Sequence, residues 1–135
     1  MKYCLALFAA LAAVACGGPL KYTVGSTPLA PGADARIVAD VNEGQQQTVL
    51  DVELSNLPPP DRVGADKKAY VGWYRKDSKA PWSRIGGLEY DDGGREGKLH
   101  GSVPEAEFDF ELTAEENTSP ASPSAEVVVA KRIAG

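Results

Sequence analysis

Residues that bind metals or act as nucleophiles are scarce in this sequence. It has two cysteines, Cys4 and Cys16, and His100 is its only histidine. Two thiols near the N-terminus cannot provide a disulfide framework or a cysteine-ligated zinc site for the rest of the chain. A catalytic triad would need its histidine in a cleft, but His100 falls on the polar side of an alternating stretch. We therefore predict no catalytic residue, no metal site and no cofactor.

Positive charge is also in deficit. The chain has 14 basic and 19 acidic residues, which gives a net charge of −5 at pH 7. An acidic domain is repelled by the phosphates of nucleic acids and by anionic lipid head groups. We therefore expect no nucleic-acid partner.

The one long apolar run lies at the N-terminus, at residues 4–14, after the positive charge of Lys2. It is shorter than the ~20 residues that span a bilayer, and its length and flank are typical of a signal peptide. A small residue, Ala15, precedes Cys16, and the sequence Gly-Gly-Pro at residues 17–19 cannot continue a helix.

This stretch resembles the lipobox of bacterial lipoproteins. In that family the signal is cleaved before the cysteine, the thiol receives a diacylglyceryl group, and the new amino terminus is acylated, for example with palmitate. The resemblance implies a signal peptide at residues 1–15 and lipid attachment at Cys16. The family usually has leucine where this chain has Ala13. A plain secretory signal with an incidental cysteine is the alternative.

After the cysteine, residues 16–34 contain prolines and glycines, and we interpret them as a tether and lead-in with a short strand at 22–24. From residue 35 apolar and polar residues alternate with the period of two that indicates half-buried strands. Several short strands between turn signals predict an all-β, immunoglobulin-like β-sandwich of about seven or eight antiparallel strands at residues 35–135. We expect the remaining strands at 35–42, 50–55, 69–75, 82–90 with a bulge at 86–87, 99–103, 108–114 and 127–133.

The alternation also predicts which side chains are buried. Residues that share a face with Leu50 or Phe110 should form the core, and their polar neighbours should be exposed. The expected core positions are Leu50, Val52, Leu54, Phe108, Phe110 and Leu112.

Aromatic residues gather at 69–75 and at the strand that follows. Trp73 is expected in the core, as a tryptophan on the central strand of an immunoglobulin-like domain is. Trp82 follows Pro81 at a strand start and is the better candidate for exposure. Together with Tyr70 and Tyr74, it is our candidate contact surface for a partner.

A second resemblance is carried by a series of short motifs along the chain. In their sequence and order they are similar to the C-terminal, extracytoplasmic domain of the anti-sigma-K factor family, and the similarity covers roughly residues 50 to 133. It implies an immunoglobulin-like sandwich and no role in transcription, because the family's sigma-binding domain and transmembrane helix have no counterpart here. The motifs lie at residues 54–60, 69–74, 112–115, 122–124 and 127–129.

Two further interpretations of the acidic residues are weaker. Asp77, Asp91, Asp92 and Glu96 offer oxygen ligands to calcium, but their spacing matches no calcium loop and a hairpin turn explains Asp-Asp-Gly-Gly. Paired carboxylates for glycoside hydrolysis would come from Asp51, Glu53, Asp109 and Glu111, which the alternation places on solvated strand faces.

The sequence thus predicts a lipid-anchored envelope lipoprotein that acts as a non-catalytic binding or structural module. Its membrane contact would be the lipid on Cys16, and its partner an envelope protein or a glycan. Gly17 stands where aspartate would retain a lipoprotein at the inner membrane, which favours the outer membrane, facing the periplasm. The alternative is a carbohydrate-binding or enzyme-accessory module that uses Trp82 and the tyrosines.

Overall fold

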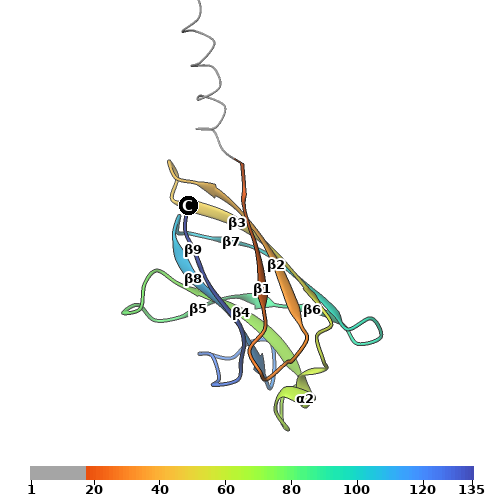
Figure 1. Ribbon diagram of the computed structural model, residues 1–135. Helices are drawn as coiled ribbons and strands as arrows, with labels where there is room; N and C mark the ends of the chain where they lie inside the picture. Colours follow the sequence, from red (N-terminus) through yellow and green to blue (C-terminus); the bar gives the residue numbers. More distant parts are fainter. Residues whose placement is uncertain (1–17) are drawn as a thin grey trace, which may run out of the picture.

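A computed structural model of the chain describes residues 18–135, so the predicted signal peptide and Cys16 lie outside the described residues. The described part forms nine strands and one short helix, α2, arranged as two sheets (Figure 1). All strand pairs are antiparallel. The elements are β1 (Leu20–Gly25), β2 (Asp34–Asn42), β3 (Gln47–Ser55), α2 (Pro60–Val63), β4 (Ala69–Arg75), β5 (Ser83–Gly87), β6 (Glu89–Asp91), β7 (Glu96–Val103), β8 (Phe108–Glu115) and β9 (Val127–Ile133).

The strand order confirms the predicted sandwich. One sheet has the order β1-β2-β3-β7-β6 and the other β5-β4-β8-β9. The sets β2-β3-β7-β6 and β5-β4-β8-β9 correspond to strands A-B-E-D and C′-C-F-G of immunoglobulin-like domains. β1, which contains the short strand predicted at 22–24, lies beside β2. The strand predicted at 82–90 is divided into β5 and β6, so the structure has nine strands where the sequence indicated seven or eight.

The pairing of β1 moves the start of the folded domain. β1 pairs with β2 in the register Leu20↔Ala39 to Gly25↔Asp34. Thr27 then donates its backbone N–H to the carbonyl of Val128 over 2.8 Å, which joins the start of the chain to β9. The sandwich therefore begins at Leu20, inside the segment that we interpreted as a lead-in.

The core lies between the sheets and largely follows the alternation. Leu50, Val52 and Leu54 are buried, whereas Asp51 and Glu53 between them are exposed. The other predicted core positions, Phe108, Phe110 and Leu112, are also buried.

The polar neighbours in β8 do not follow the prediction. Glu111 and Thr113 are buried, so the expectation that they face solvent was wrong, and Glu115 at the end of β8 is buried as well. The segment that follows β8 folds back on this face, because Ser124 donates hydrogen bonds to Glu115 and to the carbonyl of Ala114. We call residues 116–126 the cover loop.

The strand predicted at 82–90 changes sheets midway. Its first part, β5, pairs with β4, and its second part, β6, pairs with β7. Between them, Leu88 donates its backbone N–H to the carbonyl of Tyr70 over 2.9 Å. The irregularity lies near the predicted bulge: Gly72 pairs with Gly86 but Trp73 pairs with Arg84. The glycines thus precede a crossover between sheets.

The proline-rich connection after β3 is fixed by two tyrosines. Proline has no N–H to donate to a sheet, so this segment cannot continue the ladder. The hydroxyl of Tyr90 donates to the carbonyl of Leu57 over 2.6 Å, and the hydroxyl of Tyr70 donates to the carbonyl of Pro58. The two rings meet edge to face with their centroids 5.7 Å apart. Side chains therefore satisfy carbonyls that no neighbouring strand reaches.

Candidate functional site

The candidate site lies on the outer face of the four-stranded sheet. Three charged residues stand side by side there, because Arg75 of β4 pairs with Asp109 of β8, which pairs with Arg132 of β9. This row crosses the sheet at the ends of the strands where residues 76–82 connect β4 to β5.

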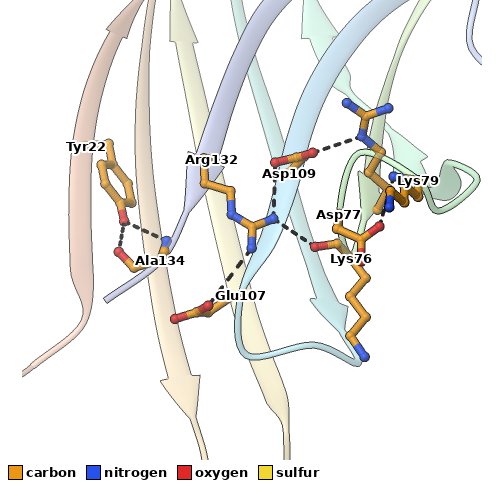
Figure 2. Close-up of polar contacts among 9 residues, drawn as sticks. Tyr22, Lys76, Asp77, Lys79, Glu107, Asp109, Arg132 and Ala134 are labelled. Atoms are coloured by element: carbon orange, nitrogen blue, oxygen red, sulfur yellow. Dashed lines mark hydrogen bonds and ion pairs between the residues drawn. The ribbon is translucent and has the colours of Figure 1, made fainter.

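Asp109 is the centre of the row (Figure 2). Arg75 Nε donates to its Oδ2 over 2.9 Å, and Arg132 Nη1 donates to its Oδ1 over 3.2 Å. Arg132 also donates to the carbonyl of Lys76 over 2.8 Å and lies 4.0 Å from a carboxylate oxygen of Glu107. Burial alone would raise the pKa of Asp109, but the hydrogen bonds from the two arginines outweigh it and lower the pKa. Asp109 therefore stays ionised and fixes both guanidinium groups.

Trp82 lies beside this row. The guanidinium carbon of Arg75 is 4.3 Å from the centroid of the Trp82 ring, which is a cation–π contact. Trp82 is consequently half-buried and held in place. One ring is thus positioned by an arginine that is itself positioned by Asp109.

Glu111, two residues along β8 from Asp109, has a contrasting environment. It is 9% exposed, and no residue of 18–135 donates a hydrogen bond to its carboxylate. Burial raises its pKa, and the positive charge of Arg75 offsets this only in part. Its oxygens are not sealed from solvent, so within residues 18–135 this carboxylate is free to accept hydrogen bonds from a molecule in the cleft.

These groups line one shallow cleft of about 330 Å³. That volume is at the low end of the ~300–1,000 Å³ of small-molecule sites. Glu111 pairs in the sheet with Ala130 of β9, an exposed position with a small side chain, which leaves the cleft open on that side. The Trp82 cleft, as we call it, is lined by Arg75, Trp82, Asp109, Phe110, Glu111, Ala130, Lys131 and Arg132.

The tyrosines that we grouped with Trp82 lie elsewhere. Tyr70 is fully buried in the core, so it cannot contact a partner, and burial raises its pKa above the ordinary value. Tyr74 is half-buried and packs edge to face on Phe108, with centroids 6.3 Å apart. Both belong to the inner face of β4, opposite Trp82, because they alternate with Arg75 along the strand. The candidate contact surface therefore keeps Trp82 and loses Tyr70 and Tyr74.

Trp73 is buried, but outside the core between the sheets. It is 1% exposed and pairs with Glu111, on the face opposite Tyr70 and Phe110. Its indole Nε1 donates to Thr113 Oγ1 over 2.9 Å, and Thr113 in turn donates to Glu115. The expectation that Trp73 fills the sandwich core was wrong, because the cover loop shields this side of the sheet.

The remaining sequence candidates do not converge on a site. His100 Nδ1 lies 2.6 Å from Asp51 Oδ1, but both side chains are exposed on the five-stranded sheet. Asp51 and Glu53 are on that sheet, whereas Asp109 and Glu111 are on the other, so the four carboxylates do not form one pair for hydrolysis. Across residues 18–135, no three histidine, cysteine or acidic side chains are grouped so that they could hold a metal ion.

Sequence reasoning found Trp82 but missed the groups around it. Arg75 and Arg132 are far apart in the chain, and only the strand register brings both to Asp109. The available signal was the position of Arg75 at the end of an aromatic strand that precedes Trp82. Glu111 was assigned to a solvated face, because the pattern of β8 does not indicate the cover loop.

No protein family, curated protein or solved structure matches this chain when it is compared with them. The resemblances to bacterial lipoproteins and to anti-sigma-K domains therefore stay predictions from the sequence. The Trp82 cleft has to be interpreted from its own geometry. In the part of the chain that the structure describes, no helix has the length and apolar character to cross a membrane.

Proposed function

We propose that this protein is a lipid-anchored envelope lipoprotein that acts as a non-catalytic binding module, with the Trp82 cleft as its contact surface. The observation that carries the proposal is the pairing in one cleft of a positioned aromatic ring, Trp82, with a nearly buried carboxylate, Glu111, to which no residue of 18–135 donates a hydrogen bond. The anchor would be lipid on Cys16, and the location the outer membrane, facing the periplasm.

The energetics favour a binding role over a purely structural one. Burying a carboxylate away from water is costly unless a donor compensates it. Asp109 has two such donors, but Glu111 has none among the described residues. Its oxygens stay accessible from outside, so a ligand in the cleft can donate to them directly, whereas a purely structural sheet would be at least as stable with an apolar residue there.

The anchor is supported by the sequence around Cys16 and by the energetics of lipid chains. One acyl chain binds a membrane only marginally, and stable anchoring needs two signals. A diacylglyceryl group with an added amide-linked chain exceeds that requirement. The net charge of −5 adds no attraction to anionic lipid, so the lipid would provide the whole membrane affinity.

The anchor is tested by labelling with a fatty-acid analogue in bacterial cells. We expect Cys16→Ser to abolish the label and to release the protein from the membrane fraction, because serine lacks the thiol that accepts lipid. Cys4→Ser is the matched control and should keep both label and fractionation. Label retained on the Cys16→Ser variant, or a mature N-terminus at another residue, would refute the lipoprotein assignment.

The contact surface is tested by photo-crosslinking in the native envelope. A photoreactive amino acid at Ser83, which is exposed next to Trp82 and does not line the cleft, should form a defined adduct that Trp82→Ala removes. The same amino acid at Val49, exposed on the other sheet, is the control. If Ser83 and Val49 give the same adducts, or if Trp82→Ala changes nothing, the proposed binding surface is wrong.

A further inference from the structure

We propose that the Trp82 cleft binds a single uncharged sugar ring, with a hydroxyl of the sugar donating to Glu111 and its C–H face against the exposed side of Trp82. The inference rests on the proposed binding role of this cleft and names the class of its ligand. It follows from the hydrogen-bonding groups, the charge and the size of the cleft.

The polar groups of the cleft suit a ligand that both donates and accepts hydrogen bonds. At its floor, the carboxylate of Glu111 can only accept once it is ionised. At its wall, Arg75 uses Nε for Asp109, and no residue of 18–135 accepts a hydrogen bond from its other nitrogens. Sugar hydroxyls do both, because each offers one O–H and two lone pairs, as the hydroxyls of serine and threonine do.

The charge of the lining disfavours an ionic ligand. Lys131 also lines the cleft, but it alternates with Arg132 along β9 and its ammonium lies 4.9 Å from the centroid of the Tyr22 ring, on the other face of the sheet. The charges that face the cleft are therefore the two positive charges of Arg75 and Arg132 and the two negative charges of Asp109 and Glu111. A cationic ligand at Glu111 would meet the guanidinium of Arg75, and an anionic ligand at Arg75 would meet the carboxylate of Asp109, which is 2.9 Å from its Nε. Like charges at this range are costly in a partly buried site. An uncharged ligand avoids both repulsions.

The size of the cleft and the Trp82 ring also favour a sugar. A cleft of about 330 Å³ admits one ring and its substituents, and not a long buried chain. Tryptophan presents a large, rigid apolar surface with few rotatable bonds, so it contributes contact area at low entropic cost. The C–H face of a pyranose is apolar while its rim carries hydroxyls, and this matches an indole beside a carboxylate.

The test uses the full chain, produced with its own N-terminal segment, on an array of neutral, acidic and amino glycans. We expect the protein to retain neutral glycans on the array. Its affinity for the neutral disaccharide that binds best should be the same at low and high salt, because an uncharged ligand forms no ion pair that salt could screen. Trp82→Ala and Glu111→Gln should each weaken that binding by ~10-fold or more, because a hydrogen bond to a charged acceptor contributes about 1.5–3 kcal/mol. Glu53→Gln, an exposed acid on the other sheet, is the matched control and should bind like the wild type.

A second variant keeps the test decisive if Glu111→Gln perturbs the fold. Ala130→Leu adds bulk at an exposed position beside Glu111, so it should fill the cleft and abolish binding without touching a buried group. Retention of acidic or amino glycans alone, affinity that falls steeply with salt, or full affinity in Ala130→Leu would overturn the inference. No retained glycan would also overturn it. The crosslink at Ser83 would still report separately on the proposed binding role.

Discussion

Two acidic residues on the same face of one strand have opposite electrostatic environments. Asp109 accepts hydrogen bonds from two arginines, which lower its pKa despite burial. Glu111, two positions away, is nearly buried with no donor among residues 18–135, and its pKa is raised. In the sequence both are acids in an alternating strand, so their different roles depend on contacts with β4 and β9 that no local pattern encodes.

The two acids should change the stability of the fold with opposite signs. The raised pKa of Glu111 means that the folded state keeps a proton at a pH where the unfolded chain has lost it. The stability that Glu111 contributes to the fold is therefore lost as the pH rises through the raised pKa. We expect Glu111→Gln to have a higher Tm than the wild type at neutral pH, with a difference that shrinks as the solution becomes weakly acidic. Thermal unfolding at a series of pH values measures it.

Asp109→Asn is the control with the opposite sign. The lowered pKa of Asp109 gives stability that is present above its unfolded pKa and is lost as the pH falls through its folded pKa. Replacing Asp109 with asparagine should lower the Tm at neutral pH, and this decrease in Tm should become smaller in acid. If both variants change Tm in the same direction and with the same pH dependence, the two environments have been assigned wrongly.

A tyrosine can also be tested singly. Tyr70→Phe removes the hydroxyl that donates to the carbonyl of Pro58 and leaves that carbonyl without its partner. We expect a loss of ~1–3 kcal/mol in the free energy of unfolding, measured with denaturant. Tyr74→Phe is the matched control on the same strand, since no residue of 18–135 is hydrogen-bonded to its hydroxyl, and it should change stability little. Equal losses would mean that the hydroxyl of Tyr70 does not secure the proline segment.

At the scale of elements, most strands follow from alternation, but their surroundings do not. Leu50 to Leu54 predicted a half-buried strand correctly, because one side of β3 faces solvent. β8 has the same pattern and is buried on both sides, because polar residues of the cover loop shield its outer face. The loop contains no apolar run that would indicate such packing, so Trp73 was assigned to the wrong face.

The cover loop should depend on one buried chain of hydrogen bonds. It runs from Trp73 through Thr113 to Glu115, which also accepts the backbone N–H of Ser124 over 2.8 Å. Thr113→Val keeps the shape and removes the hydroxyl, which leaves the indole N–H without an acceptor. We expect a loss of ~1–3 kcal/mol in stability and faster hydrogen exchange at Ser124.

Thr118→Val is the control for that substitution, because Thr118 is an exposed residue of the same loop. It should leave exchange at Ser124 unchanged. If Thr113→Val leaves stability and exchange as they are in the wild type, the hydrogen-bond chain does not hold the loop.

At the scale of the whole molecule, the sequence predicted the sandwich and one member of its cleft. The layers follow from period-two runs separated by turns, which are local signals. The crossover at Leu88, the pairing of β1 with β2 and the meeting of Arg75 and Arg132 at Asp109 depend on contacts that the local pattern does not encode. Such pairings are fixed by register and packing, so a single sequence shows the strands but not their neighbours.

With the proposed lipid on Cys16, the same global arrangement would set an orientation at the membrane. Only residues 17–19 separate Cys16 from β1, and an extended chain spans at most ~3.6 Å per residue, so Leu20 would lie within ~14 Å of a lipid on Cys16. Gly18, the β2–β3 turn at Asn42–Gln47 and Gly135 line one depression at this end of the sandwich, and α2 is at the opposite end (Figure 1). We therefore expect the β2–β3 turn to face the bilayer and α2 to face away.

This orientation can be measured because a protein cleaved and lipidated at Cys16 has no free thiol. A single cysteine at Gln45, in the β2–β3 turn, or at Asp66, just after α2, can carry a fluorophore on protein in lipid vesicles that contain a head-group quencher. We expect strong quenching at Gln45 and little at Asp66, and a flexible Gly-Ser insertion after Gly17 should reduce the difference, because a longer tether lets the domain turn and move away. Equal quenching at both positions with the natural tether would mean that the short tether does not orient the sandwich, and that the Trp82 cleft is presented to its partner at no fixed angle.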